Sequence, residues 1–203
     1  MRLALPLLAW TAAACSSTAP SSRLYHFSTV PIAAATPLGA VSMAVGPLTP
    51  AAHLLEQRIA ARVSDVELEY YAGHRWAAPL SELLPEAVLQ GLADAGLFRE
   101  VVRGGESAGR ADVILSGVVL AFEEEDRAEG WFGVARLDLV LRAARSDRIL
   151  WSGRAHGERR ASARHPVQVV EALRGALGDA LASVPWREAL APPPPSSPSP
   201  PPG

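Results

Sequence analysis

The second half of the chain carries three apolar runs joined by short links. Residues 111–122 (ADVILSGVVLAF) are almost all apolar, which is typical of a strand covered on both faces. Residues 134–144 alternate between apolar and polar positions, and residues 149–159 form a third strand-like run. The apolar face of the middle run is formed by Leu137, Leu139, Leu141 and Ala143. Because the links are short, we expect the three strands to form an antiparallel meander.

Two segments have the apolar spacing of amphipathic helices instead. The first spans residues 80–95 and the second residues 165–184. We expect Pro85 and Pro166 to lie in the first turns of these helices, where the missing N–H costs little. Gly96 is a natural C-terminal cap for the first helix. The predicted buried stripes are Leu80, Leu84, Val88, Leu92 and Ala95 in the first helix, and Val167, Val170, Leu173, Leu177, Ala180 and Val184 in the second.

Shorter strands are predicted in the first half of the chain. Residues 24–30 and 40–45 are strand-like and are interrupted by prolines, including those of the segment GPLTP. Residues 57–63 and 66–71 alternate around a Ser-Asp turn and predict a hairpin. Residues 97–102 predict a further strand. The order of strands and helices predicts an α+β fold, with an antiparallel or mixed sheet and two helices packed on one face.

The ends of the chain differ from this pattern. We assign residues 1–14 to a signal peptide, 15–23 to a Ser/Thr/Pro tether, 24–190 to one domain and 191–203 to a proline-rich tail. The apolar core of the signal is too short to span a bilayer comfortably. The tail (PPPPSSPSPPPG) is expected to be extended and disordered, as a passive tail or as a spacer in the cell envelope.

Cys15 is the only cysteine and follows the small residues Ala12, Ala13 and Ala14. This ending resembles a bacterial lipobox, in which the cysteine receives a lipid and the chain is cut just before it. An ordinary signal peptide cut at A-x-A would instead leave a free thiol near the new N-terminus. Lipidation gives the single cysteine a role, and fatty acids such as palmitate would anchor the protein to a membrane without spanning it. Ser16 in place of Asp favours the outer membrane.

Composition narrows the function. The net charge of −2 is close to neutral, which argues against a nucleic-acid partner. All 19 residues of the Lys/Arg class are arginines, which we interpret as a compositional bias. The share of apolar residues, 49%, is enough for a core.

The stretch from Val45 to Phe98 carries a family resemblance. It contains VGPLTP, the predicted hairpin, and the hexapeptide Arg75-Trp76-Ala77-Ala78-Pro79-Leu80 before the first helix. Together with the tyrosine-containing strand at residues 24–27, this resembles the ABC-type transport auxiliary lipoprotein family, which includes paraquat-inducible protein C. The family pattern is close to R-W-A-E-P-L, so Ala78 replaces its glutamate and no role of that carboxylate carries over.

The resemblance implies a function. Such lipoproteins accompany ABC transporters with MCE-domain components, which move phospholipids or other hydrophobic molecules across the cell envelope. The family's role would be to bind and dock an MCE-domain partner from the periplasmic side of a membrane, without catalysis or a cofactor. The alternative is a structural lipoprotein that acts as a scaffold or adaptor in envelope assembly.

Four residues are candidates for partner binding. Arg75 and Trp76 are of types enriched in interface hot spots. Their structural alternative is that Trp76 packs beneath the first helix and Arg75 pairs with a nearby carboxylate. Trp131 and Phe132 lie between two glycines and would contact a partner or lipid, or pack at a strand end.

Other polar residues are weaker candidates for a functional site. The run Glu123–Asp126 is expected to be a solvated hairpin loop. Asp112 and Asp138 lie in predicted strands without an evident partner. The five histidines lack metal-ligand spacing, so no metal site is expected. The sequence contains no nucleophile elbow or phosphate-binding loop, which argues against an envelope hydrolase.

Overall fold

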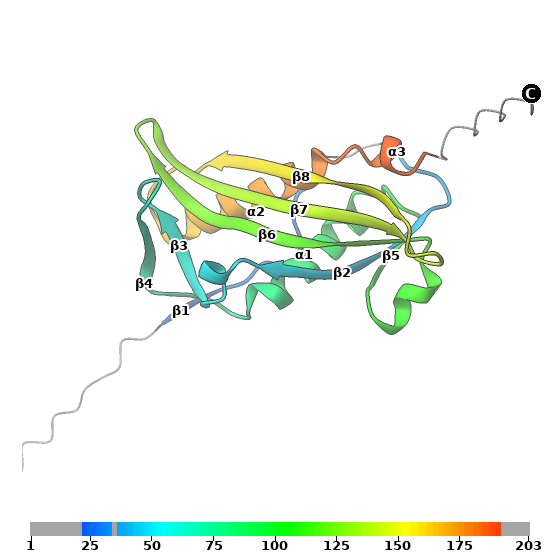
Figure 1. Ribbon diagram of the computed structural model, residues 1–203. Coiled ribbons are helices and arrows are strands. Elements are labelled where there is room, and N and C mark those ends of the chain that lie inside the picture. The colour runs from blue at the N-terminus through cyan, green and yellow to red at the C-terminus, as the bar shows by residue number, and fades with distance from the viewer. Residues whose placement is uncertain (1–21, 34–35, 192–203) are drawn as a thin grey trace, which may run out of the picture.

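The computed structural model describes residues 22–33 and 36–191. Within them, eight strands form one mixed sheet with α-helices on one side, so the predicted α+β fold is confirmed (Figure 1). Cys15 and the proline-rich tail lie outside the described residues. The strands are β1 (Arg23–Tyr25), β2 (Ser42–Pro50), β3 (Arg58–Arg62), β4 (Leu68–Trp76), β5 (Glu100–Arg103), β6 (Val113–Arg127), β7 (Gly130–Ala143) and β8 (Ile149–Arg160). The α-helices are α1 (Leu80–Asp94), α2 (Pro166–Ala182) and α3 (Trp186–Ala189), and short 3₁₀ turns are η1 (Ala52–Leu54) and η2 (Glu106–Arg110).

The predicted antiparallel meander is present as β6, β7 and β8. Strand β6 is the centre of the sheet, because β7 pairs with one of its edges along the whole strand and two strands share the other edge. On that second edge, β2 pairs in parallel with residues 113–119, and β3 pairs in parallel with Glu124 and Glu125. Beyond them, β5 pairs with β2, while β4 and then β1 continue from β3. The β1–β4–β3 unit therefore joins the main sheet through a short contact.

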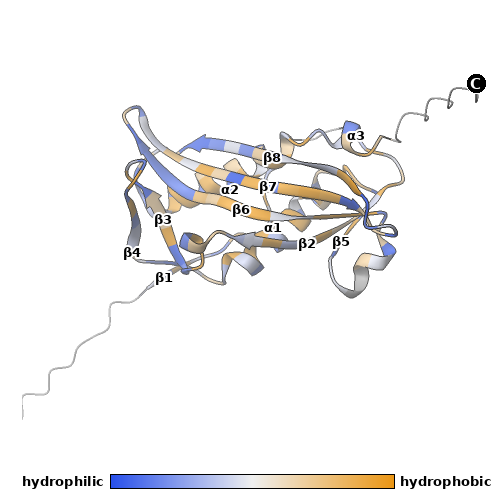
Figure 2. Ribbon diagram, viewed as in Figure 1, coloured by the Kyte–Doolittle hydropathy of each residue, from blue (hydrophilic) through white to orange (hydrophobic). Residues whose placement is uncertain are grey.

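The core lies between the sheet and the helices. Figure 1 shows α1 and α2 on the same side of the sheet, and Figure 2 shows apolar residues along the middle of β6 and β7. The apolar stripe predicted for α1 is buried from Leu80 to Leu92, as is that of α2 from Val170 to Val184. Val167 is 46% exposed, because it lies in the first turn of α2, so its place in the buried stripe was wrong.

Prolines explain most differences from the predicted elements. Strand β2 continues through Pro47 to Pro50, where we expected the segment GPLTP to end it, because the register shifts between Val45 and Leu48. A proline is tolerated at such an irregularity. Pro166 begins α2 as predicted. Pro85 lies inside α1 and not in its first turn, so the carbonyl of Ser81 loses its helical donor.

The ends of other elements also shift. Strand β1 is only three residues long and contains two residues of the expected range 24–30, and β5 begins three residues later than predicted. Gly96 follows α1 with a φ of 64°, a left-handed conformation that suits its predicted capping role. The short helix α3 was not predicted; the Trp186 indole donates to the carbonyl of Leu181 at 3.0 Å and fixes it to the end of α2.

Candidate functional site

Trp76 ends β4 and belongs to the core. Its side chain is 1% exposed, and its ring centroid lies 5.6 Å from that of Phe122 and 6.0 Å from that of Phe27. Trp76 is therefore a core residue, and its side chain offers no surface to a partner. The backbone N–H of Trp76 also donates to Gln57, which fixes the end of the β3–β4 hairpin.

Arg75, the neighbour of Trp76, points the other way and is exposed. The structural alternative, in which Arg75 pairs with a nearby carboxylate, was wrong. Its Nη2 lies 3.4 Å from Oε1 of Gln57, an amide, and no salt bridge joins it to a carboxylate in the described part of the chain. The reason is that Arg58 lies opposite Arg75 on the paired strand β3 and forms the salt bridge with the carboxylate of Glu56, at 2.6 Å.

Trp131 and Phe132 begin β7 and are both half-buried. Trp131 packs against the edge of the core. Phe132 has the guanidinium carbon of Arg127 4.6 Å from its ring centroid, which is a cation–π contact. These two aromatic residues therefore combine strand-end packing with partial exposure at the β6–β7 hairpin.

The acidic run from Glu123 to Asp126 is part of β6, so its prediction as a solvated loop was wrong. Glu123 and Glu124 have no exposed surface. Alternate side chains point to opposite faces of a strand, so Glu123 and Glu125 share one face and Glu124 and Asp126 the other. A buried carboxylate needs a charged or hydrogen-bonding partner. The partners come from distant parts of the chain.

Glu123 is held by two side chains of the first half of the chain. Nε of Arg62 donates to Oε1 at 2.5 Å, and Nε2 of His53 lies 3.0 Å from Oε2. On the same face, Glu125 accepts from Arg127 and Arg136, each at 2.8 Å. This face of the run is therefore a compact network of carboxylates and guanidinium groups.

Glu124 faces the helix side of the sheet. Its carboxylate accepts a short hydrogen bond from the hydroxyl of Tyr71 and lies 3.2 Å from Nε of Arg164. Arg164 also reaches Asp126 at 3.1 Å, so one arginine contacts both carboxylates of this face. Burial raises the pKa of Glu124 above its ordinary value, and the hydrogen bond from Tyr71 partly offsets this. Burial, together with Glu124, also raises the pKa of the Tyr71 hydroxyl.

The two strand aspartates have partners after all. Asp112 accepts hydrogen bonds from the backbone and the hydroxyl of Ser42, both at 2.8 Å, and these lower its pKa. Asp138 is paired with Arg154 across β7 and β8 at 2.9 Å, and this pair lowers the pKa of Asp138. Both aspartates thus stabilise sheet contacts.

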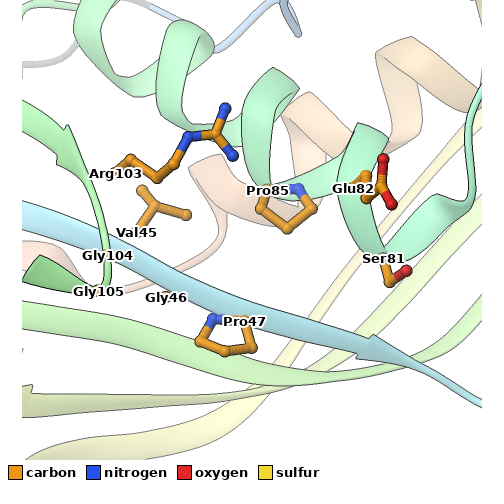
Figure 3. A pocket seen from close by; sticks show the side chains of 9 residues that line it. All are labelled: Val45, Gly46, Pro47, Ser81, Glu82, Pro85, Arg103, Gly104 and Gly105. Atoms are coloured by element: carbon orange, nitrogen blue, oxygen red, sulfur yellow. The ribbon is translucent and has the colours of Figure 1, made fainter.

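A surface pocket of about 320 Å³ lies between β2, the first half of α1 and the loop after β5. In Figure 3, Arg103 lies at one end of this pocket, and Ser81 and Glu82 lie at the other. Arg103 is paired with Glu86 of α1. Ser81 is the one hydroxyl side chain among the described lining residues, and no histidine is among them.

Two of the histidines contact side chains of other elements. His53 contacts Glu123, and Nδ1 of His74 lies 2.8 Å from the Tyr25 hydroxyl. No group of three or more metal-ligating side chains occurs within residues 22–33 and 36–191. Of the helices in this part of the chain, none has the length and apolar character needed to cross a membrane.

Sequence reasoning missed the partners of the acidic run, namely Arg62, Tyr71, Arg136 and Arg164. Arg62, Tyr71 and Arg136 lie in β3, β4 and β7, and Arg164 lies in the loop before α2, so only the fold brings them together. The one local signal was the run itself, because four adjacent carboxylates within a strand need nearby cations to be buried.

Two solved structures share the fold. A Xanthomonas campestris protein of the DUF330 family has 23% identity and a TM-score of 0.66, with 79% of this chain and 92% of that chain covered. A second crystal structure of an uncharacterised protein has 17% identity and a TM-score of 0.60, with 84% and 99% covered. A search of curated proteins finds no match.

The family model of the ABC-type transport auxiliary lipoprotein component matches residues 25–184, which is nearly the whole described domain. This match includes the β3–β4 hairpin, the Arg75–Leu80 segment and the acidic strand. The chain therefore belongs to the ABC-type transport auxiliary lipoprotein component family.

Proposed function

We propose that this protein is the lipid-anchored auxiliary component of an ABC transport system whose MCE-domain subunit is its partner. The system would move phospholipids or other hydrophobic molecules across the cell envelope. The observation that carries this proposal is the family match over residues 25–184, together with the lipobox at Cys15. The lipid on Cys15 holds the domain at a membrane, and Ser16 favours the outer membrane.

The domain is suited to docking a partner, since its interior is filled by its own side chains. Leu84, Leu115 and Leu173, from α1, β6 and α2, have no exposed surface and meet between the sheet and the helices. Close-packed interiors of this kind have low compressibility and transmit force. A rigid body on a lipid anchor can fix the position of a partner relative to the membrane.

We place the partner-binding surface at the β6–β7 hairpin, which projects at one end of the sheet (Figure 1). Phe132 is half-exposed there and is covered by the guanidinium of Arg127. Aromatic and arginine side chains are the types that most often dominate binding energy at protein interfaces. Trp131 supports Phe132 from the core side.

Site-specific cross-linking tests this assignment. A photoreactive amino acid replaces Glu129, in the β6–β7 turn, in cells that produce the ABC and MCE-domain proteins of the same system. The matched control is the same amino acid at Ser146, in the turn at the other end of β7. Both positions are exposed, so neither replacement disturbs the core.

We expect a cross-link to the MCE-domain protein from position 129 and not from position 146. Failure to recover an MCE-domain protein from either position would count against the transport role. Recovery of an unrelated envelope protein from position 129 would favour the scaffold function instead.

A further inference from the structure

Three exposed side chains form a row across the β1–β4–β3 unit. Leu24 of β1 is in register with Arg75 of β4, and Arg75 is in register with Arg58 of β3. Leu24 is 66% exposed, and both arginines are exposed. Leu55, which is 65% exposed, lies in the loop before β3 and lines the same groove as the two arginines. We call these four residues the tether-side surface.

The charges of this surface are not balanced. Like charges directly opposite each other on paired strands are unfavourable, and Arg58 and Arg75 are placed in this way. Arg58 is compensated by Glu56 at 2.6 Å and by the Tyr70 ring, whose centroid is 4.4 Å away. Arg75 has only the amide of Gln57, at 3.4 Å, among the described residues. The pair therefore retains positive charge that an external anion could neutralise.

A groove lies between the two arginines. It has a volume of about 410 Å³ and is lined by Leu55, Glu56, Gln57, Arg58, Arg75 and Pro79. Guanidinium groups bind phosphate oxygens in bidentate geometry. The exposed leucines beside this groove add apolar contact at the same face. A basic groove flanked by exposed apolar side chains suits the interface of a membrane, where phosphates and acyl chains meet.

The tether places this surface close to a bilayer. The described chain begins at residue 22, directly before β1, and the seven residues 16–22 separate β1 from Cys15. Seven extended residues span at most about 25 Å. If Cys15 carries the anchor, which is part of the proposed function, β1 lies within that distance of the membrane. The end of the described chain beyond α3 lies at the opposite end of the molecule (Figure 1).

We propose that the tether-side surface binds the surface of the anchoring bilayer. The phosphate of an anionic phospholipid occupies the groove between Arg58 and Arg75, and Leu24 and Leu55 contact the boundary of the acyl chains. The lipid anchor then holds the domain at the membrane, and this surface sets its orientation. The β6–β7 hairpin remains available to a partner.

Vesicle flotation with the mature chain carrying Cys15→Ser tests this proposal without the acyl anchor. The vesicles contain phosphatidylethanolamine with either phosphatidylglycerol or phosphatidylcholine. The test variants are Arg75→Gln and the double variant Leu24→Ser with Leu55→Ser. The matched controls are Arg187→Gln on α3 and Ile149→Ser at the start of β8, which are also exposed.

We expect binding to the phosphatidylglycerol vesicles and much weaker binding to the neutral ones. Arg75→Gln should weaken binding about fivefold, the effect of one basic residue at an anionic membrane. The leucine variant should weaken it about tenfold, because apolar burial is lost. The controls should bind like the parent. All five replaced positions are exposed, and unchanged thermal unfolding of each variant would confirm that it folds.

Three results would overturn the proposal: no binding to anionic vesicles, equal losses in test and control variants, or unchanged binding of both test variants. Loss of the partner cross-link in Arg75→Gln, with vesicle binding unchanged, would assign this surface to a protein instead. None of these results bears on acylation of Cys15, because the tested chain lacks it. The lipid anchor is tested separately, by measuring whether the wild-type chain is retained at membranes.

Discussion

Nε of Arg62 on β3 donates to Oε1 of Glu123 on β6 at 2.5 Å, and Glu123 has no exposed surface. The two residues are 61 positions apart in the sequence. Strand β3 pairs with β6 at only two positions. The ion pair therefore reinforces the short contact through which the β1–β4–β3 unit is attached to the main sheet.

Replacing Glu123 by alanine should destabilise the protein by about 3 kcal/mol, because it leaves the partly buried guanidinium of Arg62 without its carboxylate. Arg62 and His53 both lose their carboxylate, and water reaches them only partly, since each side chain is 28% exposed. The free energy of unfolding in urea measures the effect. Glu67→Ala, at an exposed position in the β3–β4 turn, is the control. A loss no larger than that of the control would show that the network does not stabilise the fold.

Neighbouring glutamates on β6 have pKa values shifted in opposite directions. Burial raises the pKa of Glu124 from its ordinary 4.5, so the folded protein holds this proton more tightly than the unfolded chain. Burial also opposes the charge of Glu125, but hydrogen bonds and charges from Arg127 and Arg136 outweigh it and lower the pKa. The contribution of Glu124 to stability is therefore present below pH 4.5 and lost as the pH rises through its folded pKa. That of Glu125 is present above pH 4.5 and lost as the pH falls through its folded pKa.

Two variants should separate these contributions. Relative to wild type, Glu124→Gln should become more stable as the pH rises, because it removes a buried carboxylate that is costly to ionise. Glu125→Gln should become less stable over the same range, because it loses an ionised partner of two arginines. Urea unfolding of the three proteins from acid to neutral pH measures both trends. Parallel stability profiles for the two variants would contradict the assigned pKa directions.

The acidic run shows where sequence reasoning fails. Four adjacent carboxylates have the composition of a solvated turn, and nothing near them in the sequence indicates otherwise. Arg62 and Arg164 lie far from the run along the chain, and only long-range pairing brings their charge to it. The burial of Glu123 and Glu124 therefore depends on residues that the fold brings to them, and the sequence of the segment alone could not predict it.

Local patterns predicted the meander and the two long helices because their apolar spacing is the cause of their burial. The prolines were harder to interpret. Pro47 was expected to end a strand and Pro85 to lie in the first turn of a helix. Pairing of β2 with β6 and packing of α1 against β2 outweigh the local cost. The sequence allowed either Arg75 or Trp76 to face solvent and did not decide between them. The structure exposes Arg75 and buries Trp76.

Cys15→Ser should release the protein from membranes that are washed at high salt, because the wash screens the charge attraction of the tether-side surface and a lipid anchor would resist it. The substitution removes the thiol that would receive the lipid, and no helix in the described ranges is long and apolar enough to hold the chain in a bilayer. Fractionation of cells, with mass measurement of the wild-type N-terminus, tests this directly. Ser16→Ala, which leaves the cysteine intact, is the control. Unchanged membrane retention of Cys15→Ser, or an unmodified wild-type cysteine, would refute lipidation.

The packing of α2 on β8 depends on the absence of a side chain at Gly157. A Cβ added there would collide with the backbone carbonyl of Ala176 and the amide of Ala180, neither of which can move without shifting the helix. Gly157→Ala should therefore destabilise the protein by about 2 kcal/mol through overpacking. Gly109→Ala is the matched control, because no atom lies within 4 Å of its added Cβ, and its effect should stay within about 0.5 kcal/mol. Urea unfolding of both variants measures the difference. Equal stability of the two would mean that α2 can move away from the sheet at no cost, and the close contact at Gly157 would then not be a determinant of the fold.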